Sequence, residues 1–407
     1  MKRKLPLVPL LLFAVVFLLI NGYAINALAP VIPAYLLSWL WIFPVVLLAL
    51  FTHSLLKLST NGQTILFKIS AHVLLVYFVS LLVFVLTEVL TDIYRLISGG
   101  TKYFSTGEFI YPERPLNGIY LGILLTSLII IAFAYGIIRG KYAYRIIKHT
   151  LYFDDLPAAF DGFKLVQISD VHAGSLNNPK AVQRGIDLIN RQQADLFVFT
   201  GDLVNNKAEE IKPYINHFSQ VRAPFGQFSI LGNHDYGDYV KWENDLVKKE
   251  NLHQLKKYHA EIGFKLLLDE HATLEKSGQK IILAGVENWG LGFGERGDLN
   301  KALQGTNTDD FKILLSHDPT HWDAQVKNHP SKINLTLGGH THGMQFGIEA
   351  FGIKWSPVQF RYKHWAGIKE ENNRVLNVNR GFGFIGFSGR VGIWPEITLI
   401  ELKKSGS

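Results

Sequence analysis

The chain has 407 residues, with 41 Lys and Arg, 34 Asp and Glu, and no cysteine. The lack of cysteine excludes disulfides, thiolate zinc sites and cysteine nucleophiles. The formal net charge is +7; residues 1–141 carry +6 of it and the remaining residues only +1. Because a nucleic-acid-binding domain normally has its own basic surplus, nucleic acid is an unfavoured partner for the second part.

The first third has the composition of a membrane domain. Residues 5–56 contain no Lys, Arg, Asp or Glu, and about 20 apolar residues cross a bilayer as a helix. Pro30 and Pro33 interrupt this stretch near its middle. We therefore predict a transmembrane domain over residues 1–141, with spans at about 5–24, 33–53, 68–90 and 117–138.

Basic residues in the short loops predict the orientation of these spans. They lie at residues 2–4, in the loop between the second and third spans, and after the fourth span at 139–148. Loops rich in Lys and Arg stay in the cytoplasm. The pattern predicts an integral protein of the inner, cytoplasmic membrane, with both termini and the following domain in the cytoplasm. Cleavage of residues 1–29 as a signal peptide is disfavoured, because Pro30 would follow the cut.

The acids of the predicted membrane domain are few. Glu88 and Asp92 fall at the end of the third span, and we interpret them as interfacial residues. A substrate pathway through a membrane usually requires paired charges within the spans. The sequence shows no such pairs, which argues against a transporter.

From about residue 142 the pattern changes to alternating strands and helices. Such alternation is typical of a layered α/β domain, which we assign to residues 142–407. Two helices are predicted at about 179–191 and 242–264. Apolar, β-prone runs predict strands at about 164–169, 196–200, 228–231, 281–284, 312–316 and 335–338.

Five short polar motifs each follow one of these apolar runs. In α/β domains the functional groups gather in the loops that leave the strand ends. One such motif alone is weak support for a function, but five in a fixed order are difficult to explain as structural residues. They are Asp170-Val171-His172, Gly201-Asp202, Gly232-Asn233-His234-Asp235, Ser316-His317-Asp318 and Gly339-His340-Thr341-His342-Gly343.

The residue types in these motifs suit metal ions. Alternate residues of an extended segment point the same way, so Asp170 and His172 can bind one ion, and His340 and His342 are expected to face the same side. The carboxylate of Asp202, exposed by the preceding glycine, can bridge two ions. Imidazole and oxygen ligands without sulfur favour Mn²⁺, Fe or Zn²⁺. The motifs predict two divalent ions side by side and the hydrolysis of phosphate esters.

Three further residues receive expected roles. The amide oxygen of Asn233 suits a hard or borderline ion, and the neighbouring His234 would face the substrate. Asp235 would hold the His234 imidazole in its protonated form. A metal pair would activate water near neutral pH, and His234 would stabilise the phosphoryl oxygens or protonate the leaving group.

The ordered motifs resemble those of the calcineurin-like metallophosphoesterase superfamily, and especially its bacterial membrane-associated branch, over about residues 150–403. The resemblance implies a four-layer αββα sandwich, here preceded by the four-helix transmembrane domain. It also implies that His234 contacts the scissile phosphate. It assigns the first metal to Asp170, His172, Asp202 and His342, and the second to Asp202, Asn233, His317 and His340.

The membrane anchor and the resemblance together suggest a substrate. An anchored catalytic domain favours a phosphodiester or pyrophosphate of a membrane-associated lipid, and UDP-diacylglucosamine pyrophosphatases occur in this superfamily. A general phosphodiesterase acting on soluble esters is the alternative. A membrane sensor or scaffold with an inactive site is the alternative of another class. The sequence leaves the metal identity and the oligomeric state open.

Some residues have two interpretations of similar weight. Arg390 either binds a substrate phosphate or makes a structural pair. The aromatic and basic stretch Trp355–Trp365 either packs in the core, which we prefer, or faces the bilayer. Histidines outside the five motifs, such as His259, are interpreted as surface or packing residues.

Overall fold

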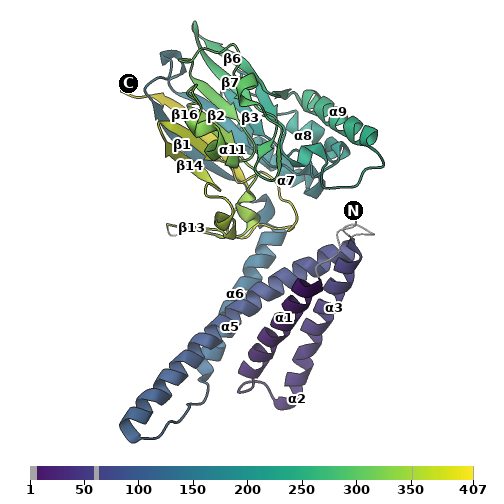
Figure 1. Ribbon diagram of the computed structural model, residues 1–407, viewed down its shortest axis with the longest axis vertical. Helices are drawn as coiled ribbons and strands as arrows, with labels where there is room; N and C mark the ends of the chain where they lie inside the picture. The colour runs from purple at the N-terminus through teal and green to yellow at the C-terminus, as the bar shows by residue number, and fades with distance from the viewer. Residues whose placement is uncertain (1–6, 59–63, 351, 407) are drawn as a thin grey trace. The chain divides into compact units, whose positions relative to one another are not determined.

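The computed structural model describes residues 7–58, 64–350 and 352–406 (Figure 1). The chain separates into two compact units, Met1–Tyr135 and Gly136–Ser407. The described part of the first unit is helical, and the described strands all belong to the second. The predicted start of the first span at residue 5, and the basic residues 2–4, lie outside the described residues.

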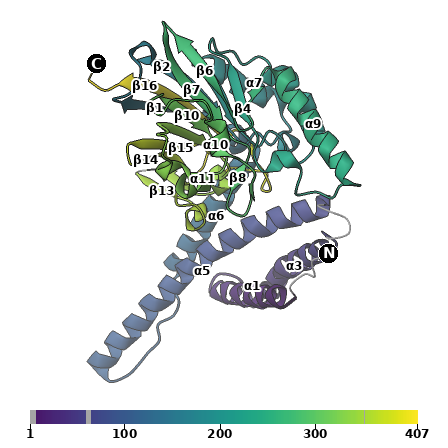
Figure 2. The ribbon, with the colours of Figure 1, turned by 45° about the horizontal axis from the view of Figure 1, so that its top comes forward.

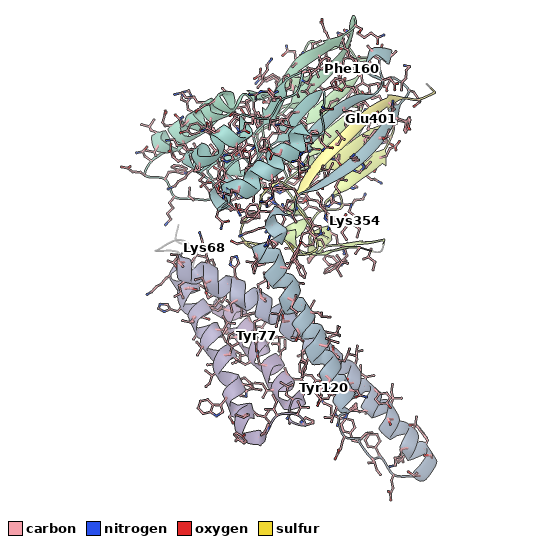
Figure 3. All side chains as sticks on the ribbon, turned by 180° about the vertical axis from the view of Figure 1, so that it is seen from behind. Lys68, Tyr77, Tyr120, Phe160, Lys354 and Glu401 are labelled. Atoms are coloured by element: carbon pink, nitrogen blue, oxygen red, sulfur yellow. The ribbon has the colours of Figure 1, made fainter. Side chains whose placement is uncertain are left out.

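Four apolar helices of the first part are long enough to cross a membrane. The predicted helical membrane domain is therefore confirmed. In addition to apolar packing, Tyr77 of the third helix donates a hydrogen bond to Asn21 of the first (Figure 3). The four are α1 (Leu7–Ala27), the stretch made of α2 (Ala34–Leu37), η1 (Ser38–Trp41) and α3 (Ile42–Leu56), then α5 (Ile65–Thr106) and α6 (Leu116–Ile138).

The third of these helices is much longer than predicted. The expected span at 68–90, followed by a loop at 91–116, is instead one helix of 42 residues that ends at Thr106. Beyond the apolar part, an ion pair between Asp92 and Arg95 at 2.6 Å stabilises the helix at i,i+3 spacing. Gly107 ends it in a left-handed conformation with φ 76°. Hydropathy measures the apolar length of a segment, so the charged continuation of the helix was missed.

The expectation that the membrane domain has no paired charges is wrong for the part of it that the structure describes. Glu88 is fully buried, and Arg114 binds it at 3.0 Å and Asp92 at 2.6 Å. Tyr23 of α1 also donates to Asp92 at 2.7 Å. The sequence does not reveal this cluster, because Arg114 lies 26 residues after Glu88 and 22 residues after Asp92. Paired charges therefore exist in the helical unit, and their absence cannot be used against transport.

The second unit contains two six-stranded sheets. In the first, with order β1-β16-β2-β3-β4-β5, the strands from β2 to β5 are mutually parallel. Its strands are β1 (Arg145–Phe153), β2 (Phe163–Ile168), β3 (Leu196–Thr200), β4 (Gln227–Ile230), β5 (Lys265–Leu266) and β16 (Glu396–Lys404).

In the second sheet, with order β14-β15-β11-β10-β7-β6, the four central strands are parallel. The strands are β6 (Glu270–Lys276), β7 (Gln279–Gly285), β10 (Lys312–Leu315), β11 (Leu335–Gly338), β14 (Gly367–Glu371) and β15 (Arg374–Val378). Two small hairpins complete the described strands: β8 (Trp289–Gly290) with β9 (Gly294–Glu295), and β12 (Ile348–Ala350) with β13 (Ile353–Trp355).

The two sheets face each other across an apolar core, and short or long helices cover their outer faces (Figures 1 and 2). The helices α7 (Pro179–Asn190), α8 (Ile215–Phe218) and α9 (Asp245–Ile262) cover the first sheet. The helices α10 (Leu299–Ala302) and α11 (Thr320–Ala324) cover the second. The predicted four-layer αββα sandwich is confirmed.

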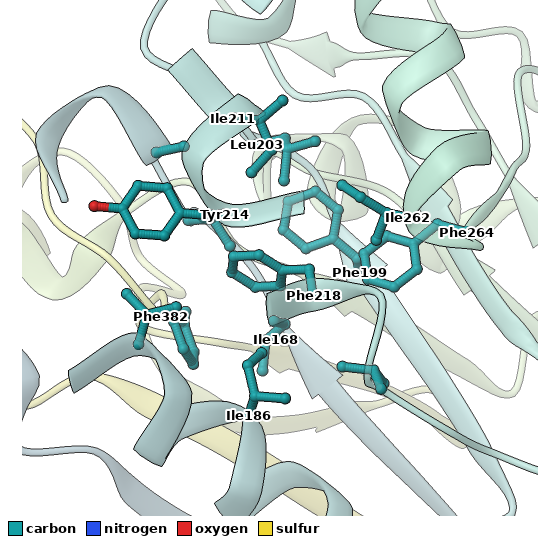
Figure 4. Close-up of a cluster of buried hydrophobic side chains, with 14 of the residues drawn as sticks. Ile168, Ile186, Phe199, Leu203, Ile211, Tyr214, Phe218, Ile262, Phe264 and Phe382 are labelled. Atoms are coloured by element: carbon teal, nitrogen blue, oxygen red, sulfur yellow. The ribbon is translucent and has the colours of Figure 1, made fainter. Parts of the chain in front are cut away.

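The burial of strand β3 on both faces explains why its continuous apolar run correctly predicted a strand. Leu196 and Val198 point into the core between the sheets, whereas Phe197 and Phe199 point toward the covering helices. A parallel strand buried on both faces needs apolar residues at every position. Figure 4 shows Phe199 packed in the outer core with Phe218 and other large side chains. The six predicted strands all occur, with ends shifted by one or two residues.

A buried histidine in this outer core makes stability depend on pH. His259 of α9 contacts Ser229 of β4 at 2.9 Å, and burial lowers the pKa of His259 to about 3. As pH falls below the ordinary histidine pKa near 6.5, only the unfolded chain takes up this proton, so stability is lost. At pH 5 the loss from this residue is about 2 kcal/mol.

We expect the His259→Gln variant to lose less thermal stability than the wild type between pH 7 and pH 5. The measurement is the melting temperature of the full chain in detergent, followed by tryptophan fluorescence. Gln keeps a hydrogen-bonding group near Ser229 but cannot titrate, so the comparison isolates the proton. Parallel pH profiles for the two proteins would contradict the prediction.

Candidate metal centre

The topology brings the five motifs to one edge of the sandwich. Strands β2, β3 and β4 are parallel neighbours in the first sheet, and β10 and β11 are parallel neighbours in the second. The motif residues follow the carboxyl ends of these strands, where the loops of parallel strands meet. Residues from both sheets thereby converge, and they form two groups of potential metal ligands.

The first group contains Asp170, His172 and His342, all three buried, with their ligand atoms within 4.8 Å of one another. The Nε2 atoms of the two histidines lie 2.9 Å apart. Nε2 of His342 lies 3.2 Å from a carboxylate oxygen of Asp170. Imidazole and carboxylate lone pairs thus point at a common centre.

The second group contains Asp202, His317 and His340. Nε2 of His317 lies 3.2 Å from Oδ2 of Asp202, and the same oxygen lies 3.6 Å from Nε2 of His172 in the first group. Nδ1 of His340 contacts Oδ1 of Asn233 at 2.9 Å. Asp202 therefore lies between the two groups, and Asn233 joins the second.

The backbone at these positions is strained. A positive φ is uncommon for residues other than glycine, and it persists only where the surroundings impose it. Such outliers concentrate at functional sites. Five of the seven expected metal ligands have it: Asp170 (φ 51°), His172 (46°), Asp202 (62°), His340 (71°) and His342 (51°).

Two glycines of the motifs allow the close approach of the strand-end loops. A Cβ atom at Gly232 would lie 2.3 Å from Oδ1 of Asp202. At Gly201, which has φ 93°, a Cβ would lie 2.6 Å from the backbone nitrogen of Gly232. A side chain at Gly232 would displace the Asp202 carboxylate, and one at Gly201 would displace the Gly232 backbone and the His317 ring.

Charge within the site opposes the effect of burial. Burial alone would raise the pKa of Asp202, but the neighbouring imidazole of His317 outweighs it and holds that pKa well below its usual value. For His317, burial works against protonation, yet the Asp202 carboxylate raises the pKa to about 10. Burial keeps the pKa of His172 well below its usual value. A cation at the second group would therefore meet an ionised carboxylate and displace a proton from His317.

The residues present fit a pair of divalent cations. Nδ1 of His317 contacts the Thr200 carbonyl at 2.7 Å, which makes Nδ1 the donor and directs Nε2 into the site. Nε2 of His317 thereby points at Oδ2 of Asp202, 3.2 Å away. Two ligand atoms that point at each other inside a buried site are in a position to share one cation. The donor set of imidazole, carboxylate and amide oxygen suits Mn²⁺, Fe or Zn²⁺.

Asn233 and His234 are held by different partners. The Asn233 amide nitrogen donates to the Tyr239 hydroxyl at 2.7 Å, which turns the amide oxygen toward His340. Nδ1 of His234 lies 2.8 Å from the Asn205 carbonyl, and its ring lies against the Tyr239 ring at 4.4 Å. Nε2 is the nitrogen of His234 that remains for a substrate.

The structure does not place Asp235 beside the His234 imidazole. Its buried carboxylate accepts backbone N–H groups of Asp202 at 2.9 Å, Leu203 at 2.8 Å and Gly232 at 2.9 Å. The expectation that Asp235 keeps His234 protonated is therefore wrong. Asp235 directly follows His234, but its carboxylate accepts hydrogen bonds from the backbone of the loops after β3 and β4 instead.

Arg390 has a structural environment. It is fully buried, and its guanidinium donates to the carbonyls of Gly383 at 2.6 Å and Arg380 at 2.8 Å. Its Nη2 also lies 3.2 Å from Nδ1 of His342. These contacts favour the structural pairing over direct phosphate binding, with Arg390 supporting the loop beside His342.

Comparison with known proteins shows to which protein family the chain belongs. A family model described as "Calcineurin-like phosphoesterase" matches residues 163–344. The Bacillus subtilis protein "Uncharacterized metallophosphoesterase YkuE" is 32% identical over 261 residues, covering 63% of this chain and 85% of that protein. The chain belongs to the calcineurin-like phosphoesterase family. A second family model, "Probable Calcineurin-like phosphoesterase, transmembrane domain", matches residues 5–141 of this phosphoesterase.

Other relatives share the same domain. An Aquifex aeolicus protein, "Uncharacterized metallophosphoesterase", is 26% identical over 271 residues, covering 65% of this chain and 94% of its own length. The Danio rerio "Transmembrane protein with metallophosphoesterase domain" is 26% identical over 296 residues, covering 70% of this chain. The matched region spans only 62% of that relative. This calcineurin-like phosphoesterase is thus an integral membrane enzyme of the metal-dependent phosphoesterase type.

The phosphoesterase also has site residues to which the sequence analysis gave no role. Asp318, which directly follows His317, places Oδ2 3.3 Å from Nε2 of His340. The Tyr362 hydroxyl contacts the same nitrogen at 2.7 Å. Asp318 stood inside a recognised motif, so its position was a usable signal. Tyr239 and Tyr362 offered none, because tyrosine is common in loops and neither residue belongs to one of the five motifs.

The residues Gly343-Met344-Gln345 directly follow the last histidine of the fifth motif. Met344 adopts φ 54° and is 58% exposed, so its side chain lies at the surface beside the site. Gln345 is buried, and it donates to the Phe387 carbonyl at 2.7 Å. Met344 therefore belongs to the outer surface near the site, and Gln345 belongs to its buried support.

Proposed function

We propose that this protein binds two divalent metal ions and hydrolyses phosphodiester or pyrophosphate bonds. The observation that carries the proposal is the position of Asp202, whose Oδ2 lies 3.2 Å from His317 and 3.6 Å from His172. One carboxylate can therefore serve both ligand groups. In this proposal the first ion is held by Asp170, His172, Asp202 and His342, and the second by Asp202, Asn233, His317 and His340.

The side chains around the ligands position them for this reaction. A bound pair of divalent cations supplies charge for the phosphoryl oxygens and lowers the pKa of water. Tyr362 and Asp318 hold the outer nitrogen of His340, as carboxylates commonly do for histidine ligands. His234 binds the scissile phosphate through Nε2 and, when protonated, donates its proton to the leaving oxygen.

Surroundings of the site support an amphiphilic substrate. A cavity of about 370 Å³ lies beside Tyr362 and is lined by Arg361, Lys363 and Leu291, among others. Basic and apolar groups together suit a phosphate-bearing lipid headgroup or a nucleotide-linked lipid such as UDP-diacylglucosamine. The four apolar helices keep the enzyme at a bilayer. The basic loops favour a cytoplasmic catalytic domain in the inner membrane.

Two alternative functions would require different properties of this protein. A general phosphodiesterase would turn over soluble esters as well as lipid esters. A membrane sensor or scaffold with an inactive site would need no competent ligand set, yet every expected ligand position and His234 carry suitable residues. The geometry favours an active hydrolase.

The proposal is tested with the full chain in detergent, stripped of metal with EDTA and dialysed. Added Mn²⁺, Fe²⁺ or Zn²⁺ is expected to restore hydrolysis of bis(p-nitrophenyl) phosphate, and UDP-diacylglucosamine in mixed micelles is expected to be the better substrate. Asn233→Ala is the matched inactive control. Two bound ions without turnover of either compound would contradict the proposed hydrolase. Equal turnover of both would favour the general phosphodiesterase.

A separate expectation concerns Tyr239, whose hydroxyl orients the Asn233 amide. Tyr239→Phe keeps the ring beside His234 and removes only the hydroxyl. We expect the affinity for the second metal ion to fall about 10-fold, as is common when an outer partner of a ligand is lost. Metal titration followed by activity measures the change. Tyr152→Phe, at an exposed tyrosine on β1, is the control; identical titration curves for the two variants would refute the role.

A further inference from the structure

The hairpin of β12 and β13 has one apolar and one charged face. In this antiparallel pair Ile348 lies opposite Trp355, and Ala350 lies opposite Ile353. Directly opposite residues share a face of a hairpin, and alternate residues along a strand do so as well. These four residues therefore form one face, and the pair Glu349 and Lys354 lies on the other.

The charged face of this hairpin makes polar contacts with the rest of the domain, although Glu349 and Lys354 both remain exposed. Glu349 pairs with the buried side chain of Arg380. Lys354, labelled in Figure 3, donates to the Ala366 carbonyl and lies 5.1 Å from the centre of the Trp365 ring. A hairpin that packs on a soluble domain normally does the reverse, with its apolar face inside.

The apolar face of the hairpin is correspondingly open. Ile348 is 51% exposed and Ile353 is 56% exposed. Two neighbouring segments add to it: Phe360, at the end of η9 (Pro357–Phe360), is 82% exposed, and Met344 lies in η8 (His342–Gln345). We refer to Met344, Ile348, Ile353 and Phe360 as the apolar patch.

The flanks of the apolar patch are basic. Arg361 and Lys363 directly follow Phe360 and are exposed. Exposed apolar residues beside Arg and Lys are the composition of segments that lie in the interfacial region of a bilayer with anionic lipids. The sequence stretch 355–365 is therefore divided: Tyr362 and Trp365 pack in a small core, as preferred, while Phe360 faces outward.

Two backbone hydrogen bonds connect the apolar patch to the end of α6. The last residues of α6, 136–138, belong to the second unit. The Arg390 amide donates to the Gly136 carbonyl at 3.2 Å. The carbonyl of the next residue, Val391, accepts the Gly347 amide at 3.0 Å, and Gly347 directly precedes Ile348 of β12. These backbone contacts connect the start of the hairpin to the last residues of α6 within the second unit.

We propose that the apolar patch docks on the surface of the bilayer in which the chain is anchored. Ile348, Ile353 and Phe360 enter the boundary between headgroups and acyl chains, and Arg361 and Lys363 lie at the level of the lipid phosphates. Met344 is two residues from His342, so docking brings the exposed side of the candidate metal centre to the membrane surface. This last consequence rests on the proposed function; the docking itself does not.

The absence of cysteine from the chain allows a direct test. Ile353→Cys and Phe360→Cys in the full protein are labelled with bimane and placed in nanodiscs of phosphatidylcholine and phosphatidylglycerol, with one protein per disc. Leu246→Cys, at a 75% exposed residue of α9, is the control. We expect doxyl-labelled lipid to quench the first two labels several-fold more than the control label, and aqueous iodide to quench them less.

Two outcomes would overturn the docking. In one, doxyl lipid quenches the labels at 353 and 360 no more than the label at 246. In the other, neither quencher reaches them, which would mean that protein covers the patch; a second copy is excluded by the single occupancy of each disc. Both readouts are independent of catalysis, so an inactive enzyme would refute the proposed function without deciding the docking.

An activity comparison tests the consequence for substrate access. The double variant Ile353→Glu/Phe360→Glu is expected to hydrolyse a bilayer-resident p-nitrophenyl phosphodiester of diacylglycerol about 10-fold more slowly, equivalent to the loss of about 1.4 kcal/mol of apolar contact. Its rate with soluble bis(p-nitrophenyl) phosphate is expected to remain unchanged, and Leu246→Glu to alter neither rate. Equal losses with both substrates would overturn the proposed access from the membrane.

Discussion

Asp202→Ala is expected to abolish turnover and to release both metal ions. The carboxylate oxygen of Asp202 lies 3.2 Å from the His317 imidazole and 3.6 Å from that of His172, so one substitution removes a ligand from both groups. With the ions lost, the rate is expected to fall by roughly 10⁴-fold or more. Elemental analysis of the purified protein and the rate with bis(p-nitrophenyl) phosphate measure the two effects.

Two further variants make the Asp202 result decisive. Asp202→Asn keeps the size of the side chain and an acceptor for the His234 amide, which now binds Oδ1 at 2.8 Å. It removes the charge, and we expect the same loss of metal with less effect on folding. Asp154→Ala, at an exposed acid of the same unit, should change neither quantity. Retention of two ions by Asp202→Ala would refute its place between the groups.

His234→Ala is expected to lower turnover by roughly 10²–10⁴-fold while both ions stay bound. The His234 ring is not part of either ligand group, and its Nδ1 is occupied by the Asn205 carbonyl at 2.8 Å. Its contribution is therefore to the phosphoryl group and the leaving oxygen. The rate constants and the metal content of the variant are the measurements.

A comparison of substrates with different leaving groups distinguishes the two roles of His234. If the imidazole donates a proton to the leaving oxygen, the loss in His234→Ala should be small for p-nitrophenol, which needs no proton, and large for an alcohol. An equal loss for both would assign it to phosphate binding alone. His253→Ala, at an exposed histidine of α9, is the control. Loss of metal in His234→Ala would contradict both roles.

The metal ligands are an example of what local sequence can predict. Each motif follows its strand directly, and parallel strands bring the loops that follow them to the same edge of a sheet. Asp170 and His172 therefore appear as a pair before any tertiary structure is known, and the structure places them together. Apolar runs such as residues 196–200 identify the buried parallel strands for the same reason, because both faces must be apolar.

Contacts between residues that lie far apart in the sequence could not be predicted from these local patterns. The Asp235 carboxylate satisfies backbone amides more than 30 residues away, and the Tyr362 hydroxyl contacts His340 from 22 residues away. Strand β1 was not predicted, since its half-exposed residues resemble a linker until β16, about 250 residues later, pairs with it in parallel. Such contacts depend on how the whole chain closes, which no local pattern encodes.

The sequence by itself determined the apolar spans, the strand ends and the chemistry of their loops, because these follow from hydropathy and from backbone periodicity over a few residues. Only the tertiary structure decided which way amphipathic elements turn. In the β12–β13 hairpin, Ile348 and Glu349 alternate as in any strand, and either face could have been buried. The pairing of Glu349 with Arg380 attaches the hairpin to the domain through its charged face and leaves the apolar face open.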